Sequence, residues 1–185
     1  QLPYHYDRAM RKHGIKCKMF SPIRPVLSSY QNNRDHRKIC VIDGKVAFTG
    51  GINLADEYIN IGSKFGHWKD TGIRMSGDAV YSMQLLFIGM WNAAGGNIAP
   101  AEYPFVREEI VKGICCQPFS DGPSNNPNNP AMDMFMHVIM SAKERVDIMT
   151  PYLIIDDDML STLKYVAECG IEVIIIMPHI PDKWY

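Results

Sequence analysis

The sequence predicts an α/β protein in which helices flank a mixed or parallel sheet, and three observations support this fold class. Residues 131–177 follow the order helix, strand, helix, strand, which is typical of a parallel α/β unit. Residues 173–177 are continuously apolar, as expected of a parallel strand that is buried on both faces. Earlier in the chain, apolar runs on both sides of Asp43 and Gly44 predict a β-hairpin.

The first third of the chain alternates predicted elements with turn signals. We expect a helix over residues 4–13, because Gly14 can cap its C-terminal end, and a strand over residues 15–20. Residues 21–33 include two prolines and predict a loop that leads into the charged run before the hairpin. After the hairpin, a short helix is expected over residues 53–58.

The central region is expected to hold a strand over residues 69–75 and a long helix over residues 77–92. Apolar side chains cover most of the circumference of this helix, which favours a buried core element. The helix lacks the basic polar face of a membrane-surface helix, which argues against that alternative. The apolar residues that recur at helical spacing are Val80, Met83, Phe87 and Trp91.

The second half contains one stretch of clear loop composition. Residues 120–130 are rich in Ser, Asn, Gly and Pro, so they form either a domain linker or an active-site loop. Asp156, Asp157 and Asp158 are expected to begin a helix rather than to bind a metal ion, because acidic groups there cap the helix and interact favourably with its dipole. The remaining predicted elements are strands at 113–119, 145–150 and 171–177 and helices at 131–142 and 156–169.

Composition limits the class of protein. The chain has 185 residues, 46% of them hydrophobic and 21% charged, which is ordinary for one globular domain or parts of two. A formal net charge of −1 argues against a strongly basic nucleic-acid-binding protein. The five cysteines form no metal-binding spacing, which suggests reduced thiols and exposure to the cytoplasm. No apolar run reaches the ~18–20 residues of a membrane span, and a start at Gln1 inside a predicted helix suggests a fragment of a longer protein.

The stretch with the clearest chemistry follows the pattern H-x-K-x4-D-x6-G-G-x-N from His36 to Asn53. An unprotonated histidine can attack phosphorus and carry a phosphoryl group covalently. In an extended backbone Lys38 shares a face with His36, so its ammonium can neutralise a phosphate oxygen beside the nucleophile. The hairpin at Asp43 turns the chain back and is expected to bring Asn53 near the same site as an amide donor. Glycines such as Gly51 allow a ligand to approach the backbone closely.

This pattern resembles the HKD motif of the phospholipase D superfamily at every fixed position, with Gly51 where many members have Ser. Three longer stretches closely resemble bacterial cardiolipin synthases, namely residues 33–38, 51–58 and 68–71. The resemblance implies a phospholipase D-like fold, present here as an incomplete tandem repeat. Residues 1–112 would form the later part of the first repeat, and residues 113–185 the linker and the start of the second, without its HKD motif.

The resemblance also implies roles for individual residues. The catalytic residues would be His36, Lys38 and Asp43, and the substrate-binding residues would be Asn53, Gly51 and Arg34. The charge of Arg34 would add positive potential for an anionic headgroup. Asp70 would hold the ring of His36 through its second nitrogen and fix the tautomer, the alternative being an ordinary surface aspartate. Neither a metal nor another cofactor is expected to take part.

The function implied by the resemblance is that of a phosphatidyltransferase of the cardiolipin synthase type. Two phosphatidylglycerol molecules would form cardiolipin and release glycerol through a phosphohistidine, with His36 as nucleophile or general acid. Because members of this family join two motifs at one site, the isolated chain is expected to be inactive. The parent enzyme would act at the cell membrane of a bacterium with its catalytic part facing the cytoplasm, whereas the fragment itself would be soluble.

Two alternatives remain open. Single-motif members of the superfamily pair two identical chains, so this chain could be a phospholipase D-type phosphodiesterase or nuclease that acts as a homodimer. Nucleic acid is the less expected substrate, because the net charge is weak and the chain is rich in Met and aromatic residues. The other alternative is a non-catalytic module that binds lipid phosphates.

Overall fold

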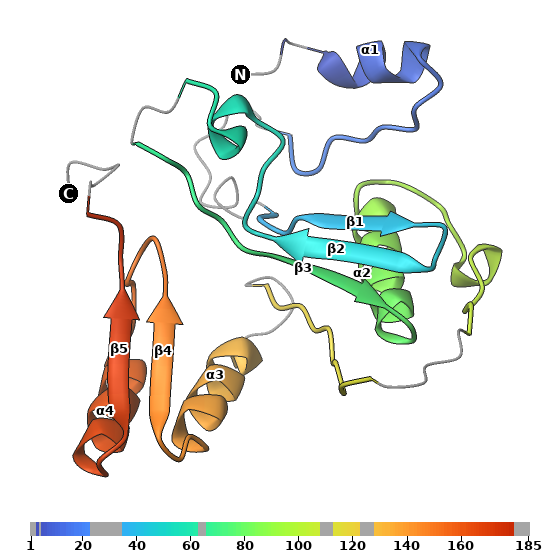
Figure 1. The fold of residues 1–185 in the computed structure, drawn as a ribbon. Helices are drawn as coiled ribbons and strands as arrows, with labels where there is room; N and C mark the ends of the chain where they lie inside the picture. Colours follow the sequence, from blue (N-terminus) through green and yellow to red (C-terminus); the bar gives the residue numbers. More distant parts are fainter. Residues whose placement is uncertain are drawn as a thin grey trace. The chain divides into compact units, whose positions relative to one another are not determined.

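The computed structural model describes residues 3, 5–22, 35–62, 66–107, 113–122 and 128–179, and the chain divides into two compact units. The first unit is Gln1–Phe119 and the second is Ser120–Tyr185, and each has its own sheet and hydrophobic core (Figure 1). The structure confirms the α/β class, with an antiparallel sheet in one unit and a parallel sheet in the other. The repeat boundary expected between residues 112 and 113 stays a prediction.

The first unit is built on a three-stranded antiparallel sheet in the order β1-β2-β3. The sheet is formed by β1 (Ile39–Ile42), β2 (Val46–Gly50) and β3 (Gly72–Ser76). The described residues of the unit also form the α-helices α1 (Tyr6–Lys12) and α2 (Ala79–Ala93) and the 3-10 helices η2 (Asp56–Ile59) and η3 (Pro100–Glu102).

The predicted hairpin is confirmed. Antiparallel pairing joins Ile39 to Thr49 and Ile42 to Val46, and the backbone N–H of Lys45 donates to the carbonyl of Ile42 at 3.0 Å. Asp43 and Gly44 both have positive φ angles, 54° and 67°, as the favoured hairpin turns require. The Asp-Gly pair therefore specifies the reversal that brings the two ends of the motif side by side.

One face of this sheet is covered by α2 (Figure 1). The core consists of Ala47, Val80 and Met83, which are at most 5% exposed, with Ile39, Val41, Met75 and Leu86 packed against them. Burial of one such aliphatic side chain contributes about 1.5–3 kcal/mol relative to leaving it in water. The prediction that Phe87 belongs to the core is wrong: its side chain is 46% exposed and packs beside Trp91.

The second unit contains a parallel pair of strands flanked by two helices, as the sequence predicts. Strands β4 (Arg145–Met149) and β5 (Glu172–Ile176) pair in parallel, and the helices are α3 (Pro130–Met140) and α4 (Asp157–Glu168). The buried core residues are Ile139 of α3 and Met159, Leu163 and Val166 of α4. The last three recur at helical spacing, so one apolar stripe of α4 faces the strands.

Three predicted elements differ from the structure. Residues 15–20 and 113–119 are not strands. In place of the helix expected over residues 53–58, the structure has the 3-10 helix η2, which begins at Asp56. Extended segments become strands only when a neighbouring strand accepts their backbone hydrogen bonds. The first segment is held differently, because the ammonium of Lys18 donates to the carbonyl of Gly95 at 2.7 Å and lies 5.5 Å from the ring centroid of Trp91.

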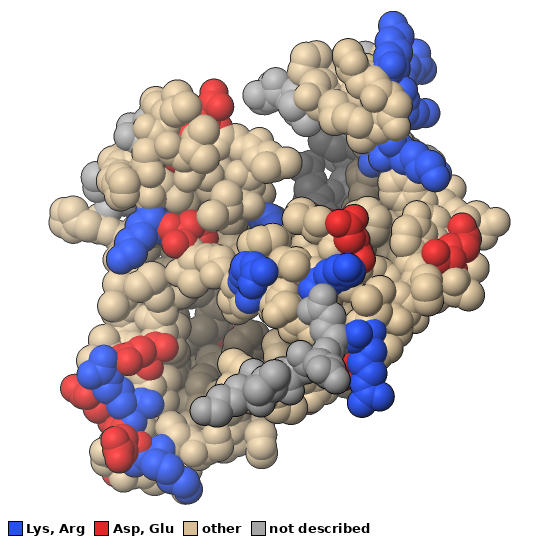
Figure 2. All heavy atoms as spheres, turned by 45° about the vertical axis from the view of Figure 1, so that its right-hand side comes forward, with Lys and Arg blue, Asp and Glu red and all other residues tan. Residues whose placement is uncertain are grey.

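The charge of the first unit is locally uneven although the chain as a whole is nearly neutral. Lys and Arg side chains gather over α1 and the segment that follows it (Figure 2). The basic residues of this region are Arg8, Arg11, Lys12, Lys16 and Lys18. In the part of the chain that the structure describes, no helix is long and apolar enough to cross a membrane.

Candidate functional site

The sheet of the first unit brings most parts of the motif to one end. His36 and Lys38 precede β1, Asn53 follows β2, and Asp70 precedes β3. Because β2 runs antiparallel to both neighbours, the starts of β1 and β3 lie at the same end of the sheet as the finish of β2. Asp43 lies in the turn at the opposite end, five residues from Lys38, or about 17 Å of extended strand. This separation excludes direct contact with a group held at His36.

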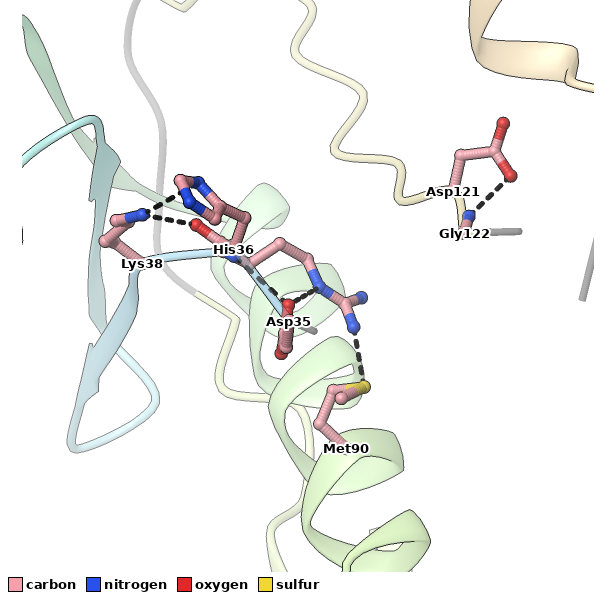
Figure 3. Close-up of polar contacts among 7 residues, drawn as sticks. Asp35, His36, Lys38, Met90, Asp121 and Gly122 are labelled. Atoms are coloured by element: carbon pink, nitrogen blue, oxygen red, sulfur yellow. Dashed lines mark hydrogen bonds and ion pairs between the residues drawn. The ribbon is translucent and has the colours of Figure 1, made fainter. Parts of the chain in front are cut away.

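Side-chain alternation before β1 sorts the charged run onto two faces, as the sequence predicts. The ammonium of Lys38 lies 3.2 Å from Nδ1 of His36, so these two residues share a face (Figure 3). Arg37 points the other way, and its guanidinium contacts Sδ of Met90 on α2 at 2.6 Å. The His-x-Lys spacing therefore places the His36 and Lys38 side chains on the face of the sheet opposite α2.

Two contacts hold Lys38 beside the imidazole. Its Nζ donates to the backbone carbonyl of His36 at 2.6 Å and approaches ring atom Nδ1 at 3.2 Å. An ammonium can only donate, so Nδ1 is the acceptor in this arrangement and a neutral ring carries its proton on Nε2. Attack through Nε2 needs the opposite tautomer. Lys38 must therefore leave Nδ1 before His36 can act as a nucleophile through Nε2.

An ion pair fixes the backbone immediately before the histidine. Oδ1 of Asp35 accepts hydrogen bonds from Nε of Arg37 at 2.8 Å and from its backbone N–H at 3.1 Å (Figure 3). Partial burial acts to raise the pKa of Asp35, but these hydrogen bonds and the positive charges of Arg37 and Lys38 together lower it below its ordinary value. The Asp35–Arg37 ion pair thus holds the Arg37 side chain away from the face that carries His36 and Lys38.

The amide of Asn53 is oriented by an aromatic residue. Its Nδ2 donates to the hydroxyl of Tyr58, and the Asn53 side chain is half-buried. An amide nitrogen carries two hydrogens, so the second can be donated to a phosphate oxygen. The predicted role of Asn53 as a neutral donor to phosphate stays a prediction.

Asp70 is held close to the glycines of the motif. Its Oδ2 accepts from the indole Nε1 of Trp68 at 3.1 Å, and its Oδ1 accepts from the backbone N–H of Thr71 at 2.7 Å. A Cβ added at Gly51 would lie 2.8 Å from Oδ2 and collide with Oδ1. The missing side chain at Gly51 is thus what lets the carboxylate sit here. Pairing of Asp70 with the ring of His36 stays a prediction.

Sequence reasoning missed the residues that support this site. Tyr58 contacts Asn53, Trp68 contacts Asp70, and Asn60 binds the backbone of Trp68 through both ends of its amide. The position of Trp68, two residues before Asp70, was the available signal, since alternation places both on one face of an extended segment. Arg34 lies outside the described residues.

Lys38 and Asn53, at this end of the sheet, suit an anion better than a metal ion. Lys38 supplies a cation, and Asn53 supplies an amide donor, whereas metal sites need several neutral or anionic ligands. Within the described ranges, no group of three or more His, Cys, Asp or Glu residues could hold a metal. Lys38 and Asn53 are donors of the kind that bind phosphate, and a phosphate site here stays a prediction.

The chain is similar to bacterial proteins named cardiolipin synthase. It is 39% identical over 186 residues to cardiolipin synthase of Alkalihalophilus pseudofirmus and 37% identical over 187 residues to cardiolipin synthase 2 of Bacillus cereus, covering 99% of this chain in both cases. It is also 46% identical over 183 residues, 98% of this chain, to an uncharacterized protein of Streptococcus mutans.

These relatives are much longer than the chain. The matched region spans 37% of the Alkalihalophilus protein, 36% of the Bacillus protein and 40% of the Streptococcus protein. No known family model matches the chain. The chain therefore matches a region that makes up well under half of each relative.

Proposed function

We propose that this chain carries the first HKD half-site of a phosphatidyltransferase of the cardiolipin synthase type, within the phospholipase D superfamily. The single observation that carries the proposal is the pairing of His36 with Lys38 on the face of the sheet opposite α2, at the same end as Asn53 and Asp70. Similarity to proteins named cardiolipin synthase over nearly the whole chain supports the choice of reaction.

In the proposed reaction, Nε2 of His36 attacks the phosphorus of a phosphatidylglycerol phosphodiester. The bond from phosphorus to the glycerol headgroup oxygen breaks, and glycerol leaves with a proton supplied by the second motif of the longer enzyme. A hydroxyl of a second phosphatidylglycerol then attacks the phosphohistidine. Its proton passes to the same second-motif group, His36 is released, and cardiolipin forms.

Lys38 and Asn53 stabilise the charge that develops on the phosphorus oxygens. The arriving anion competes for the ammonium of Lys38, which moves from Nδ1 of His36 to a phosphate oxygen. Nδ1 is then free to carry a proton and to donate it to a carboxylate, the role proposed for Asp70. Asp43, at the far end of the hairpin, supports the motif structurally rather than touching substrate.

The remaining parts of the proposal concern the whole protein. The phospholipase D-like fold would be completed by the rest of the tandem repeat, which supplies the second half of the site. Phosphatidylglycerol would be drawn from a bacterial cell membrane, with the catalytic part on its cytoplasmic side. Apart from its two lipid substrates the reaction needs no cofactor on this scheme.

The deciding experiment is a transfer assay on the full-length protein with labelled phosphatidylglycerol and mass detection of products. We expect cardiolipin and glycerol from the wild type, none from His36→Asn, and normal turnover from His67→Asn, which alters an exposed histidine of the same unit. Phosphatidic acid as the only product would make the protein a hydrolase. Wild-type turnover by His36→Asn would remove His36 from the mechanism.

A further inference from the structure

Asn53 and Asp70 lie on different segments, yet one pair of aromatic side chains connects them. Tyr58 accepts a hydrogen bond from Asn53, and Trp68 donates one to Asp70. The rings of Tyr58 and Trp68 pack with their centroids 4.6 Å apart and their planes at 58°. We propose that Tyr58 and Trp68 are positioning residues, which set the Asn53 amide and the Asp70 carboxylate for a phosphate ester at His36.

The polar group of each aromatic side chain contacts a predicted site residue, and its ring packs against the other ring. The Tyr58 hydroxyl and the Trp68 indole N–H are the only polar atoms of these side chains, and both are engaged with predicted site residues. Both residues are half-buried. Two rigid side chains with few rotatable bonds lose little conformational freedom when they hold a site in place.

Asn60 fixes the second ring from the backbone side. Its Oδ1 accepts from the backbone N–H of Trp68 at 2.6 Å, and its Nδ2 donates to the carbonyl of Trp68 at 3.1 Å. Asn60 ends η2 with a φ angle of 62°, a left-handed conformation that asparagine tolerates better than most residues. Because η2 also contains Tyr58, one short helix positions both rings.

The contacts have a direct consequence for phosphate binding. With one Nδ2 hydrogen held by Tyr58, the plane of the Asn53 amide is set and the direction of its second hydrogen follows. Trp68 and the backbone of Thr71 together hold both oxygens of Asp70 over Gly51. Removing the Tyr58 hydroxyl frees Asn53 to rotate, and removing the Trp68 indole N–H frees Asp70. The resulting loss of stabilisation is expected to be larger for the transition state than for the bound lipid.

This inference rests on the proposed function, and its test uses the full-length protein. Tyr58→Phe keeps the ring contact and removes only the hydroxyl, whereas Trp68→Phe keeps an aromatic ring and removes the indole N–H. The matched control is Tyr81→Phe, which removes a hydroxyl from a second aromatic pair, Tyr81 with Phe105, in the same unit. Steady-state transfer from phosphatidylglycerol and thermal unfolding are measured for all four proteins.

We expect kcat to fall about 3- to 10-fold in each of the two site variants, the range for loss of one hydrogen bond. The KM for phosphatidylglycerol should rise by no more than about threefold, and the unfolding temperature should stay near that of the wild type. Every value for Tyr81→Phe should match the wild type. A purely structural role would instead lower the unfolding temperature and leave kcat per folded molecule unchanged. That result, or a Tyr58→Phe enzyme with wild-type kcat, overturns the proposal.

Binding of inorganic phosphate separates this inference from the proposed function. If the wild type forms neither cardiolipin nor phosphatidic acid, the proposed function fails, and phosphate affinity decides the role of the aromatic pair. Calorimetric titration should then show affinity about 3-fold weaker for Tyr58→Phe and unchanged for Tyr81→Phe. Equal affinities, or absence of phosphate binding by the wild type, would refute the positioning role.

Discussion

At the scale of single residues, the chemistry of His36 depends on which group occupies its Nδ1. In the structure that group is the ammonium of Lys38, which also binds the carbonyl of His36. In this position the Lys38 ammonium occupies Nδ1 and is expected to leave it when an anion binds. On the proposed mechanism, Lys38 would therefore set both the tautomer of His36 and the charge balance at the phosphate.

Replacing Lys38 by Met should therefore impair transfer strongly. We expect kcat/KM to fall by about 10²–10³, because one charged donor to the transition state is lost. Steady-state transfer by the full-length protein measures this, with Lys45→Met, an exposed lysine of the hairpin turn, as the control. A loss below about threefold in Lys38→Met would show that Lys38 does not touch the phosphate.

Gly51 offers a second test at this scale. Gly51→Ala would force Asp70 off its contacts with Trp68 and Thr71, so we expect a loss of about 1–3 kcal/mol in the free energy of unfolding. Gly89→Ala is the control: nothing lies within 4 Å of an added Cβ in α2, and helix propensity predicts a gain of about 0.5–1 kcal/mol. Urea unfolding measures both. Equal stability of Gly51→Ala and wild type would show that the Asp70 carboxylate moves without cost.

Asp35 gives a pH-dependent prediction. Its pKa is lower in the folded protein than in the unfolded chain, so its pair with Arg37 stabilises the fold above the ordinary aspartate pKa, and this contribution is lost as pH falls through the folded pKa. The wild type should exceed Asp35→Asn by about 0.2–1 kcal/mol in unfolding free energy at pH 7. Urea unfolding should show the difference shrinking below about pH 4. A constant difference down to pH 2.5 would contradict this linkage.

At the scale of elements, short local signals define helix ends. Oδ1 of Asp156 accepts from the backbone N–H of Met159 at 2.9 Å, which confirms that the acidic run begins α4 by capping it. Asp156→Ala should cost about 1 kcal/mol of stability, since a first-turn N–H loses its partner. Asp157→Ala, which leaves this bond in place, should cost less. Chemical unfolding that ranks the two variants in the reverse order would contradict the assignment of the cap.

At the scale of the whole molecule, each of the two units has a hydrophobic core of its own among the described residues. Met83 belongs to the core of the first unit and Leu163 to that of the second, and both are at most 7% exposed. Truncating either to Ala should cost about 2–5 kcal/mol in its own unit. Hydrogen exchange should show lost protection in α2 for Met83→Ala and in α4 for Leu163→Ala. Equal loss in both helices from one substitution would mean that the units unfold together.

Much of the fold followed from local patterns. The hairpin needed only Asp43 and Gly44 between apolar runs, and the parallel pair β4 and β5 followed from the order of elements and the apolar run in β5. The expected strands at 15–20 and 113–119 are wrong, because strand formation depends on a partner that no local pattern reveals.

By itself, the sequence determined the chemistry of the site: a His, a Lys and an Asn at motif spacing, with alternation placing His36 and Lys38 on one face and Arg37 on the other. Tertiary structure alone decided which residues support that chemistry. It placed Asp43 at the far end of the sheet and joined Asn53 to Asp70 through Tyr58 and Trp68. The physical reason is that alternation is a property of one extended segment, whereas contacts between segments depend on strand register and on the path of the loops that connect them.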